Sequence, residues 1–203
     1  MRAGSLTPGD RSRGSEAEWG PWGVTLSISG DWGRVSEEAM AARNLGVCVD
    51  HSPGSFYALN WTMENFAKDG DNVYIIVVNK KNALDETKLS LWGESGSPPI
   101  PFDEFKDPNV IKNYGVSPST EINGIVSDSI KKKKVKVFMK VYFGDAREKI
   151  TKALAEIPVH AAFMGSRGLS RLEKVLMGSV TNHVVNHAGC PVTVIKLPGE
   201  SHH

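Results

Sequence analysis

Two glycines, a nine-residue spacer and a Gly-Ser pair give this chain its clearest chemical signal. Gly165 and Gly168 follow an apolar run, and Gly178-Ser179 precedes a run of helical periodicity that starts with Val180. Glycine has no Cβ, so the backbone can approach a ligand closely. The first amides of a helix have no partner within it and can donate to an anion. The order strand, glycine loop and helix start therefore predicts a phosphate-binding segment.

Two charged residues stand where they could serve the same ligand. Asp50 ends the apolar run 45–49, and its carboxylate can accept from an exocyclic amine or a ribose hydroxyl. Its alternative role is to cap the helix that follows. Arg167 lies inside the glycine loop and either contacts phosphates or remains a solvated loop arginine. Both residues are candidates for binding rather than for catalysis.

Signatures of other nucleotide sites and of hydrolases are missing from the sequence. It has no Gly-Lys-Ser/Thr of a P-loop, no Gly-x-Gly-x-x-Gly after the first strand and no Gly-x-Ser-x-Gly elbow. No nucleophile stands beside an evident general base. The pattern therefore predicts a site that holds a nucleotide, and we assign no catalytic residue.

Five apolar runs alternate with helical patterns along the chain and must position these residues. The runs are 45–49, 73–78, 135–141, 159–164 and 190–196. Such alternation predicts an α/β fold with a parallel sheet covered by helices on both faces. Ligands of such sheets bind outside the carboxyl ends of the strands, where the strand order reverses. We therefore expect Asp50 and the loop after Gly165 to face one crevice.

The remaining segments divide the chain into three parts. Residues 1–42 lack periodicity and are predicted to be a disordered or atypical extension, of which 1–39 could be absent from the natural protein. Residues 43–198 form the nucleotide-binding domain, and 199–203 form a tail. Within the domain, the irregular stretch 79–117 is expected to pack on the surface, and the next helix is expected to start at Ser117-Pro118.

Composition excludes several classes of partner. The net charge of +1 argues against a nucleic-acid-binding protein. The one basic run, 131–134, is interpreted as a solvated helix end, with an anionic partner site as the alternative. No segment is long and apolar enough to span a membrane. The cysteines, Cys48 and Cys190, are too few for a disulfide framework, which favours a reducing, cytoplasmic location and leaves nuclear or organellar ones open.

Histidine spacing gives no metal site of a common type. His183 and His187 stand one helical turn apart, a spacing that can chelate zinc, but no third ligand is evident. We favour the interpretation that these two histidines lie on the surface without a metal, and no metal ligand is predicted.

Taken together, the motifs resemble the ATP-binding signature of the universal stress protein family, plant branch. The resemblance rests on Gly165-x-x-Gly168 followed by Gly178-Ser179, on Val49-Asp50, on Gly144-Asp145 and on Cys190-Pro-Val, and it spans about residues 43–197. It implies a five-stranded, flavodoxin-like parallel sheet of order 3-2-1-4-5, similar to that of adenine-nucleotide α-hydrolases. His160 and Val77 depart from the family pattern, which often has Asp and His there.

The resemblance also implies a ligand and an assembly. ATP or AMP would bind in the crevice, with or without Mg²⁺, and two chains would pair through Val192–Lys196. Site roles would divide by ligand part, with base near Asp50 and Val78, ribose near Met164 and Gly165, and phosphates near Gly168, Gly178, Ser179 and Val180.

The sequence leaves three functions to be distinguished by experiment. The first is a dimeric, nucleotide-binding stress-response module, the second is a slow ATP hydrolase, and the third is a dimeric scaffold that ignores nucleotide. Nucleotide retained through purification would favour the first, and metal-dependent turnover would favour the second. A monomer in solution would count against the third.

Overall fold

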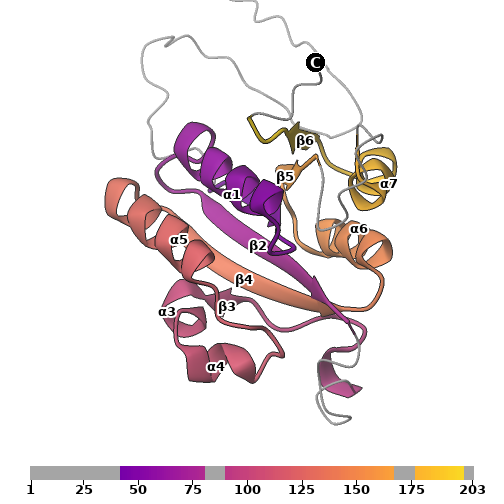
Figure 1. Cartoon of the computed structure of the whole chain (residues 1–203), viewed down its shortest axis with the longest axis horizontal. Helices are drawn as coiled ribbons and strands as arrows, with labels where there is room; N and C mark the ends of the chain where they lie inside the picture. The colour runs from indigo at the N-terminus through magenta and orange to yellow at the C-terminus, as the bar shows by residue number, and fades with distance from the viewer. Residues whose placement is uncertain (1–41, 81–89, 167–176, 199–203) are drawn as a thin grey trace, which may run out of the picture. The chain divides into compact units, whose positions relative to one another are not determined.

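The computed structural model describes residues 42–80, 90–166 and 177–198, which build one α/β sheet domain (Figure 1). The predicted extension 1–42 lies almost wholly outside the described residues, as does the tail. Six strands form one sheet in the order β3-β4-β2-β1-β5-β6. Their bounds are β1 Asn44–Cys48, β2 Asn72–Asn79, β3 Ile100–Pro101, β4 Lys136–Phe143, β5 Ala161–Gly165 and β6 Val192–Ile195.

The five long strands are parallel and stand in the predicted order 3-2-1-4-5, which is confirmed. The predicted number of strands was wrong, because β3 adds a sixth, antiparallel strand beside β4. Ile100 lies opposite Met139, and Pro101 lies opposite Phe138. Pro101 has no N–H to donate, which is tolerable because β3 is the edge of the sheet.

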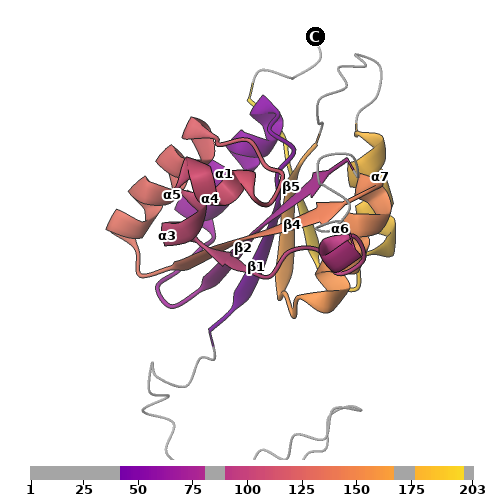
Figure 2. The same cartoon turned by 90° about the horizontal axis from the view of Figure 1, so that it is seen from below.

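Helices cover both faces of the sheet. Figures 1 and 2 show α1 and α5 on one face and α6 and α7 on the other. Residues of β1, β2 and β5 alternate between the two cores, and each face is buried, which explains why these strands are apolar throughout. The helices are α1 Pro53–Asn65, α3 Phe102–Phe105, α4 Pro108–Lys112, α5 Thr120–Lys132, α6 Ala146–Glu156 and α7 Ser179–His187.

The long connection after β2 packs against the sheet, as predicted. Trp92 stacks on Tyr114 with ring centroids 5.0 Å apart, and Phe105 is buried. Ser97 joins the connection to β4, since its amide donates to the Val141 carbonyl at 2.7 Å and its hydroxyl accepts from the Val141 amide at 3.0 Å. The connection therefore extends the sheet edge instead of floating over it.

Two details at the ends of α5 differ from expectation. The helix begins after Ser119, whose hydroxyl accepts from the Ile122 amide at 3.2 Å, and not at Ser117-Pro118. The end of the basic run is not simply solvated. Lys133 donates to the carbonyls at the end of α1, those of Met63, Glu64 and Ala67, at 2.6, 2.8 and 3.0 Å. Helix ends leave such carbonyls without hydrogen-bond donors, so Lys133, at the end of α5, supplies the donors for the last carbonyls of α1.

A part-buried ion pair fastens the chain just before β1 to the turn before β2. Arg43 Nε donates to Asp71 Oδ1 at 3.0 Å, and the Lys68 amide donates to Asp71 Oδ2 at 2.8 Å. Burial of the Asp71 carboxylate acts to raise its pKa, but the hydrogen bonds from Arg43 and Lys68 outweigh burial and lower it. The charged form of Asp71 is therefore favoured by folding.

We predict that Asp71→Asn lowers the free energy of unfolding by about 2 kcal/mol near neutral pH, because it removes the charged acceptor of Arg43. The folded pKa is depressed, so the advantage of Asp71 is fully present above about pH 4 and is lost as the pH falls through the folded pKa. Urea unfolding of both proteins across this range measures the difference. The surface variant Asp128→Asn is the control, and an equal effect of the two variants would contradict the prediction.

Candidate functional site

A cavity of ≈ 280 Å³ opens at the carboxyl ends of β1 and β5, on the side of the sheet covered by α6 and α7. This is where parallel sheets of reversing strand order hold their ligands. Its walls come from three neighbouring strands, β2, β1 and β5, from the turn after β1, and from the N-terminal parts of three helices. The lining residues are Cys48, Val49, Asp50, Ser55, Ile76, Val78, Ala146, Ile150, Met164, Gly165, Gly178, Ser179, Val180 and Thr181.

One wall of the cavity is the start of α7. Gly178 precedes the helix with no side-chain cap, and its own amide donates to the Ser166 carbonyl at 2.8 Å. The amides of Ser179, Val180 and Thr181 occupy the first three helical positions, which have no acceptor within the helix. Together with the helix dipole, these donors make this wall attractive to an anion.

The turn after β1 places Asp50 at the mouth. Asp50 Oδ1 accepts from the Ser52 amide at 3.1 Å and from the Ser52 hydroxyl at 2.6 Å. Ser52, not Asp50, is the residue that caps α1, since its Oγ accepts from the Ser55 amide at 3.2 Å. The capping alternative for Asp50 is therefore wrong. The exposed carboxylate is held in place by the two hydrogen bonds to its Oδ1.

His51 occupies a backbone conformation that favours glycine, with φ of 63°. A left-handed conformation costs a non-glycine residue about 1–2 kcal/mol. Its ring lies edge-on to Phe56 with centroids 6.0 Å apart, a contact that helps to hold the turn. The turn after β1 is thus strained at the residue next to Asp50.

The opposite wall of the cavity is apolar. Ile76 and Val78 from β2, Cys48 from β1 and Met164 from β5 line it beside Ile150 of α6. Burial raises the pKa of the Cys48 thiol to about 12, so it is a neutral, unreactive part of this wall. An aromatic ring can bury its faces here, while within the described residues the unpaired helix amides that suit a negatively charged group lie on the side of α7.

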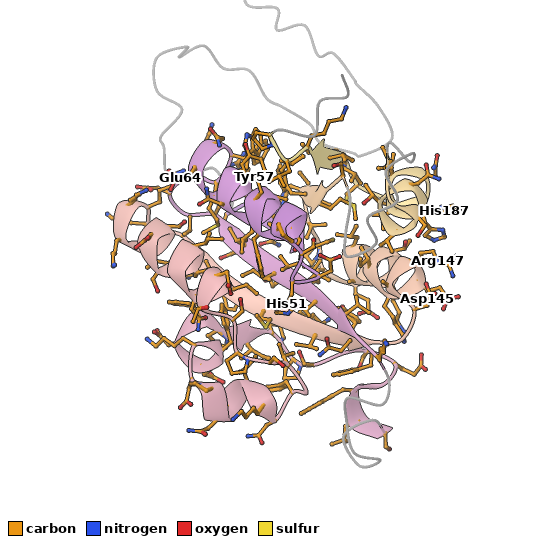
Figure 3. All side chains as sticks on the ribbon, in the orientation of Figure 1. His51, Tyr57, Glu64, Asp145, Arg147 and His187 are labelled. Carbon is orange, nitrogen blue, oxygen red and sulfur yellow. The ribbon has the colours of Figure 1, made fainter. Side chains whose placement is uncertain are left out.

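The start of α6 closes the cavity near Ala146. Asp145 caps this helix by accepting from the Arg147 amide at 2.9 Å, and the Arg147 guanidinium donates to both of its carboxylate oxygens at 3.1 and 2.9 Å. These hydrogen bonds, opposed by burial, lower the pKa of Asp145 to about 2. Figure 3 shows the two side chains together. Arg147 is thus engaged by its own helix.

Gly165 lacks a side chain for a reason that the sequence did not reveal. A Cβ there would lie 2.9 Å from both the carbonyl carbon and the oxygen of Gly54, in the first turn of α1. The backbones of β5 and α1 therefore touch at the floor of the site. Thr181 completes the joint, because its hydroxyl donates to the Gly165 carbonyl at 3.0 Å.

The structure brings most of the predicted site residues to one cavity. Asp50, Val78, Met164, Gly165, Gly178, Ser179 and Val180 all line it, whereas Arg167 and Gly168 lie outside the described residues. Sequence reasoning missed an inner set that is apolar or hydroxyl-bearing. No local pattern marks these residues as a set, because they meet only when the strands and helices are placed together. The set comprises Cys48, Ser55, Ile76, Ala146, Ile150 and Thr181.

Comparison with known proteins places the chain among proteins of this architecture. The model of the universal stress protein family matches residues 41–196, most of the chain. The chain belongs to the universal stress protein family. The match confirms the family expected from the motifs, including Gly178-Ser179, and shows that the family domain coincides with the described sheet domain.

Arabidopsis thaliana has relatives of this universal stress protein, in agreement with the plant branch. Universal stress protein PHOS32 is 29% identical over 176 residues, covering 80% of this chain and 68% of the relative. Universal stress protein PHOS34 is 28% identical over 176 residues, covering 80% of this chain and 65% of the relative. The chain thus spans about two thirds of the length of these relatives.

A solved universal stress protein family structure from Arabidopsis thaliana, with AMP bound, is also similar. It is 18% identical, and the match covers 79% of this chain and 95% of that one with a TM-score of 0.47. A likeness of that size says nothing about what this chain binds. The departures from the family pattern do not reach the site, since neither Val77, which is buried in the sheet, nor His160, whose Nδ1 accepts from the Asn44 amide at 3.0 Å, lines the cavity.

We predict that Gly165→Ala lowers the free energy of unfolding by about 2 kcal/mol, because the added methyl group meets backbone atoms that cannot rotate away. Chemical denaturation measures this loss. Gly124→Ala, in the middle of α5 with open space around it, is the matched control and should stabilise the protein by about 1 kcal/mol. Unchanged stability of Gly165→Ala would show that α1 and β5 are not held in contact.

Proposed function

We propose that this universal stress protein binds an adenine nucleotide, ATP or AMP, in the cavity and acts as a nucleotide-dependent stress-response module. The observation that carries the proposal is the division of one cavity into an apolar wall and a wall of helix amides. A nucleotide has the same division, with an aromatic base at one end and phosphates at the other. The carboxylate of Asp50 stands at the mouth, within the same lining.

The proposed orientation follows from these walls. The base lies against Val78 and Met164, and the ribose hydroxyls donate to Asp50. The phosphates accept hydrogen bonds from the amides of Ser179 and Val180. Mg²⁺, where it takes part, enters with the phosphates, because a hard cation prefers their oxygens.

The binding free energy that a nucleotide needs must come from several contacts and not from the helix start alone. A helix start contributes about 0.3–1 kcal/mol toward an anion, whereas micromolar affinity requires about 8 kcal/mol. The difference must come from burying the base, at about 25 cal/mol per Å² of apolar surface, and from several hydrogen bonds. Adenosine should therefore bind, but more weakly than ATP.

The chemistry of the site favours holding over turnover. Among the described residues at the mouth, Asp50 is hydrogen-bonded to Ser52, and the neighbouring Asp145 is bonded to Arg147. A general base must be within reach of the proton that it takes and be free to take it. Slow ATP hydrolysis stays the alternative, and measurable release of inorganic phosphate that depends on Mg²⁺ would favour it.

We predict that Ser179→Asp weakens ATP binding at least about tenfold without lowering stability, because an acidic residue suits a helix start but repels a phosphate. Isothermal titration with ATP and with adenosine, plus thermal unfolding, measures both effects. Adenosine has no phosphate, so its binding should be nearly unchanged.

A matched variant separates the two ends of the ligand. Asp50→Ala should weaken adenosine and ATP by similar factors, since it acts on the ribose that both carry. If Ser179→Asp left ATP binding intact, or weakened adenosine equally, the placement of the phosphates at α7 would be wrong.

We further propose that two chains pair through the last strand. Within the described residues β6 pairs only with β5, so its outer edge presents unpaired amides and carbonyls. Val192 and Val194 are half-buried there, and Val185 of α7 is exposed. An apolar edge strand needs a partner or a cover. A dimer that ignores nucleotide would use the same edge.

Val194→Asp should convert a dimer into a monomer, because it places a charge in the paired edge. Sedimentation velocity measures the mass of each variant. Ile130→Asp, on the exposed side of α5, is the control and should leave the dimer intact. A monomeric parent protein, or a dimer that survives Val194→Asp, would contradict pairing through β6.

A further inference from the structure

Two imidazole rings are stacked on the outer side of α7, away from the cavity. The rings of His183 and His187 have centroids 4.1 Å apart and planes inclined by only 15°. They stand four residues apart, so they lie one above the other on the same side of the helix. His183 is half-buried and His187 is exposed, as Figure 3 shows for the latter.

A hydrogen bond fixes the more exposed ring. Nδ1 of His187 lies 2.8 Å from the backbone carbonyl oxygen of His183, which can only accept. Nδ1 of a neutral ring must then carry the proton, and the lone pair is left on Nε2. Metal-binding histidines usually donate their other ring nitrogen in this way, to a carbonyl or carboxylate.

We propose that His183 and His187 form a two-imidazole site for a borderline divalent transition metal ion of the class of Zn²⁺, Ni²⁺ and Cu²⁺. Metal–nitrogen bonds of about 2.0–2.1 Å bring two ligand nitrogens to within about 3–4 Å of each other, close to the separation of these rings. Because the ring planes are inclined by only 15° and the His187 ring is held by its hydrogen bond, the His183 ring must turn for its lone pair to converge on the same ion. This proposal departs from the sequence analysis, which favoured a surface pair of histidines and predicted no metal ligand.

The position on the helix favours a cation. His187 lies in the last turn of α7, where the unpaired carbonyls carry partial negative charge. A divalent ion there is stabilised by the helix, whereas the start of the same helix attracts anions. The nearest helix, α6, places Arg147 on this side of the domain, but its charge is neutralised by Asp145 at 2.9 Å.

The donor set decides which ions fit. Imidazole nitrogen suits zinc, nickel and copper, while Mg²⁺ and Ca²⁺ prefer oxygen. The part of the chain that the structure describes holds no group of three or more metal-binding side chains. Water therefore fills the other coordination positions, and the ion exchanges readily. The metal site does not depend on the proposed nucleotide function. A bound ion links two residues one helical turn apart and so stabilises the C-terminal part of α7.

The test uses the full chain with His202→Asn and His203→Asn, which removes the two consecutive histidines that end the sequence. Titration calorimetry with Zn²⁺ alone should give one ion per chain at sub-millimolar affinity, and excess Mg²⁺ should not compete. In this background, His183→Gln and His187→Gln should each weaken Zn²⁺ binding by at least about tenfold. Zn²⁺ should also raise the thermal midpoint of the parent.

A register variant supplies the matched control. Asn182→His combined with His183→Asn keeps the number of imidazoles but separates them by five residues, which places them on different sides of the helix. It should fold as the parent does, by circular dichroism, and lose the Zn²⁺-dependent gain in thermal midpoint. Equal Zn²⁺ binding by the register variant, or no sub-millimolar binding by the parent, would overturn the proposal.

Discussion

The first amides of a helix cannot be satisfied by that helix, and this constraint organises the domain around one end of its sheet. Helix α7 starts directly after Gly178, which offers no side chain to cap it, so its unpaired amides are left free beside the cavity. The Gly178 amide is held by Ser166, and Thr181 is held by the Gly165 carbonyl. The start of α7 is thereby fixed to the strand end, and its unpaired amides are presented without having to reorganise.

The rest of the fold places the end of β1 beside the end of β5 and the start of α7. Strands β1 and β5 are neighbours although more than a hundred residues separate them, because the chain builds outward from β1 in both directions. The Gly54–Gly165 contact sets how closely α1 approaches β5, and the Ser52 cap directs Asp50. The cavity is therefore lined by segments that are far apart in the sequence, from Cys48 of β1 to Thr181 of α7.

Sequence patterns were sufficient for the parallel strands, because buried apolar runs and the glycine motif are local signals. The two-residue strand β3 was missed, since Ile100–Pro101 lies in a proline-rich stretch and exists only through pairing with β4. The roles of Lys133 and Gly165 depend on carbonyls far away in the chain, which no local pattern predicts. For the same reason the inner lining from Cys48 and Ile150 emerged only when the strands and α6 were placed together.

The most direct test of the account follows backbone amides and methyl groups by nuclear magnetic resonance as ATP is added to the full chain. The account predicts saturable shifts of the Ser179, Val180 and Thr181 amides together with the methyl groups of Val78 and Ile150, because one ligand must touch both walls. Shifts confined to other surfaces, or none at millimolar ATP, would show that the cavity is not a nucleotide site.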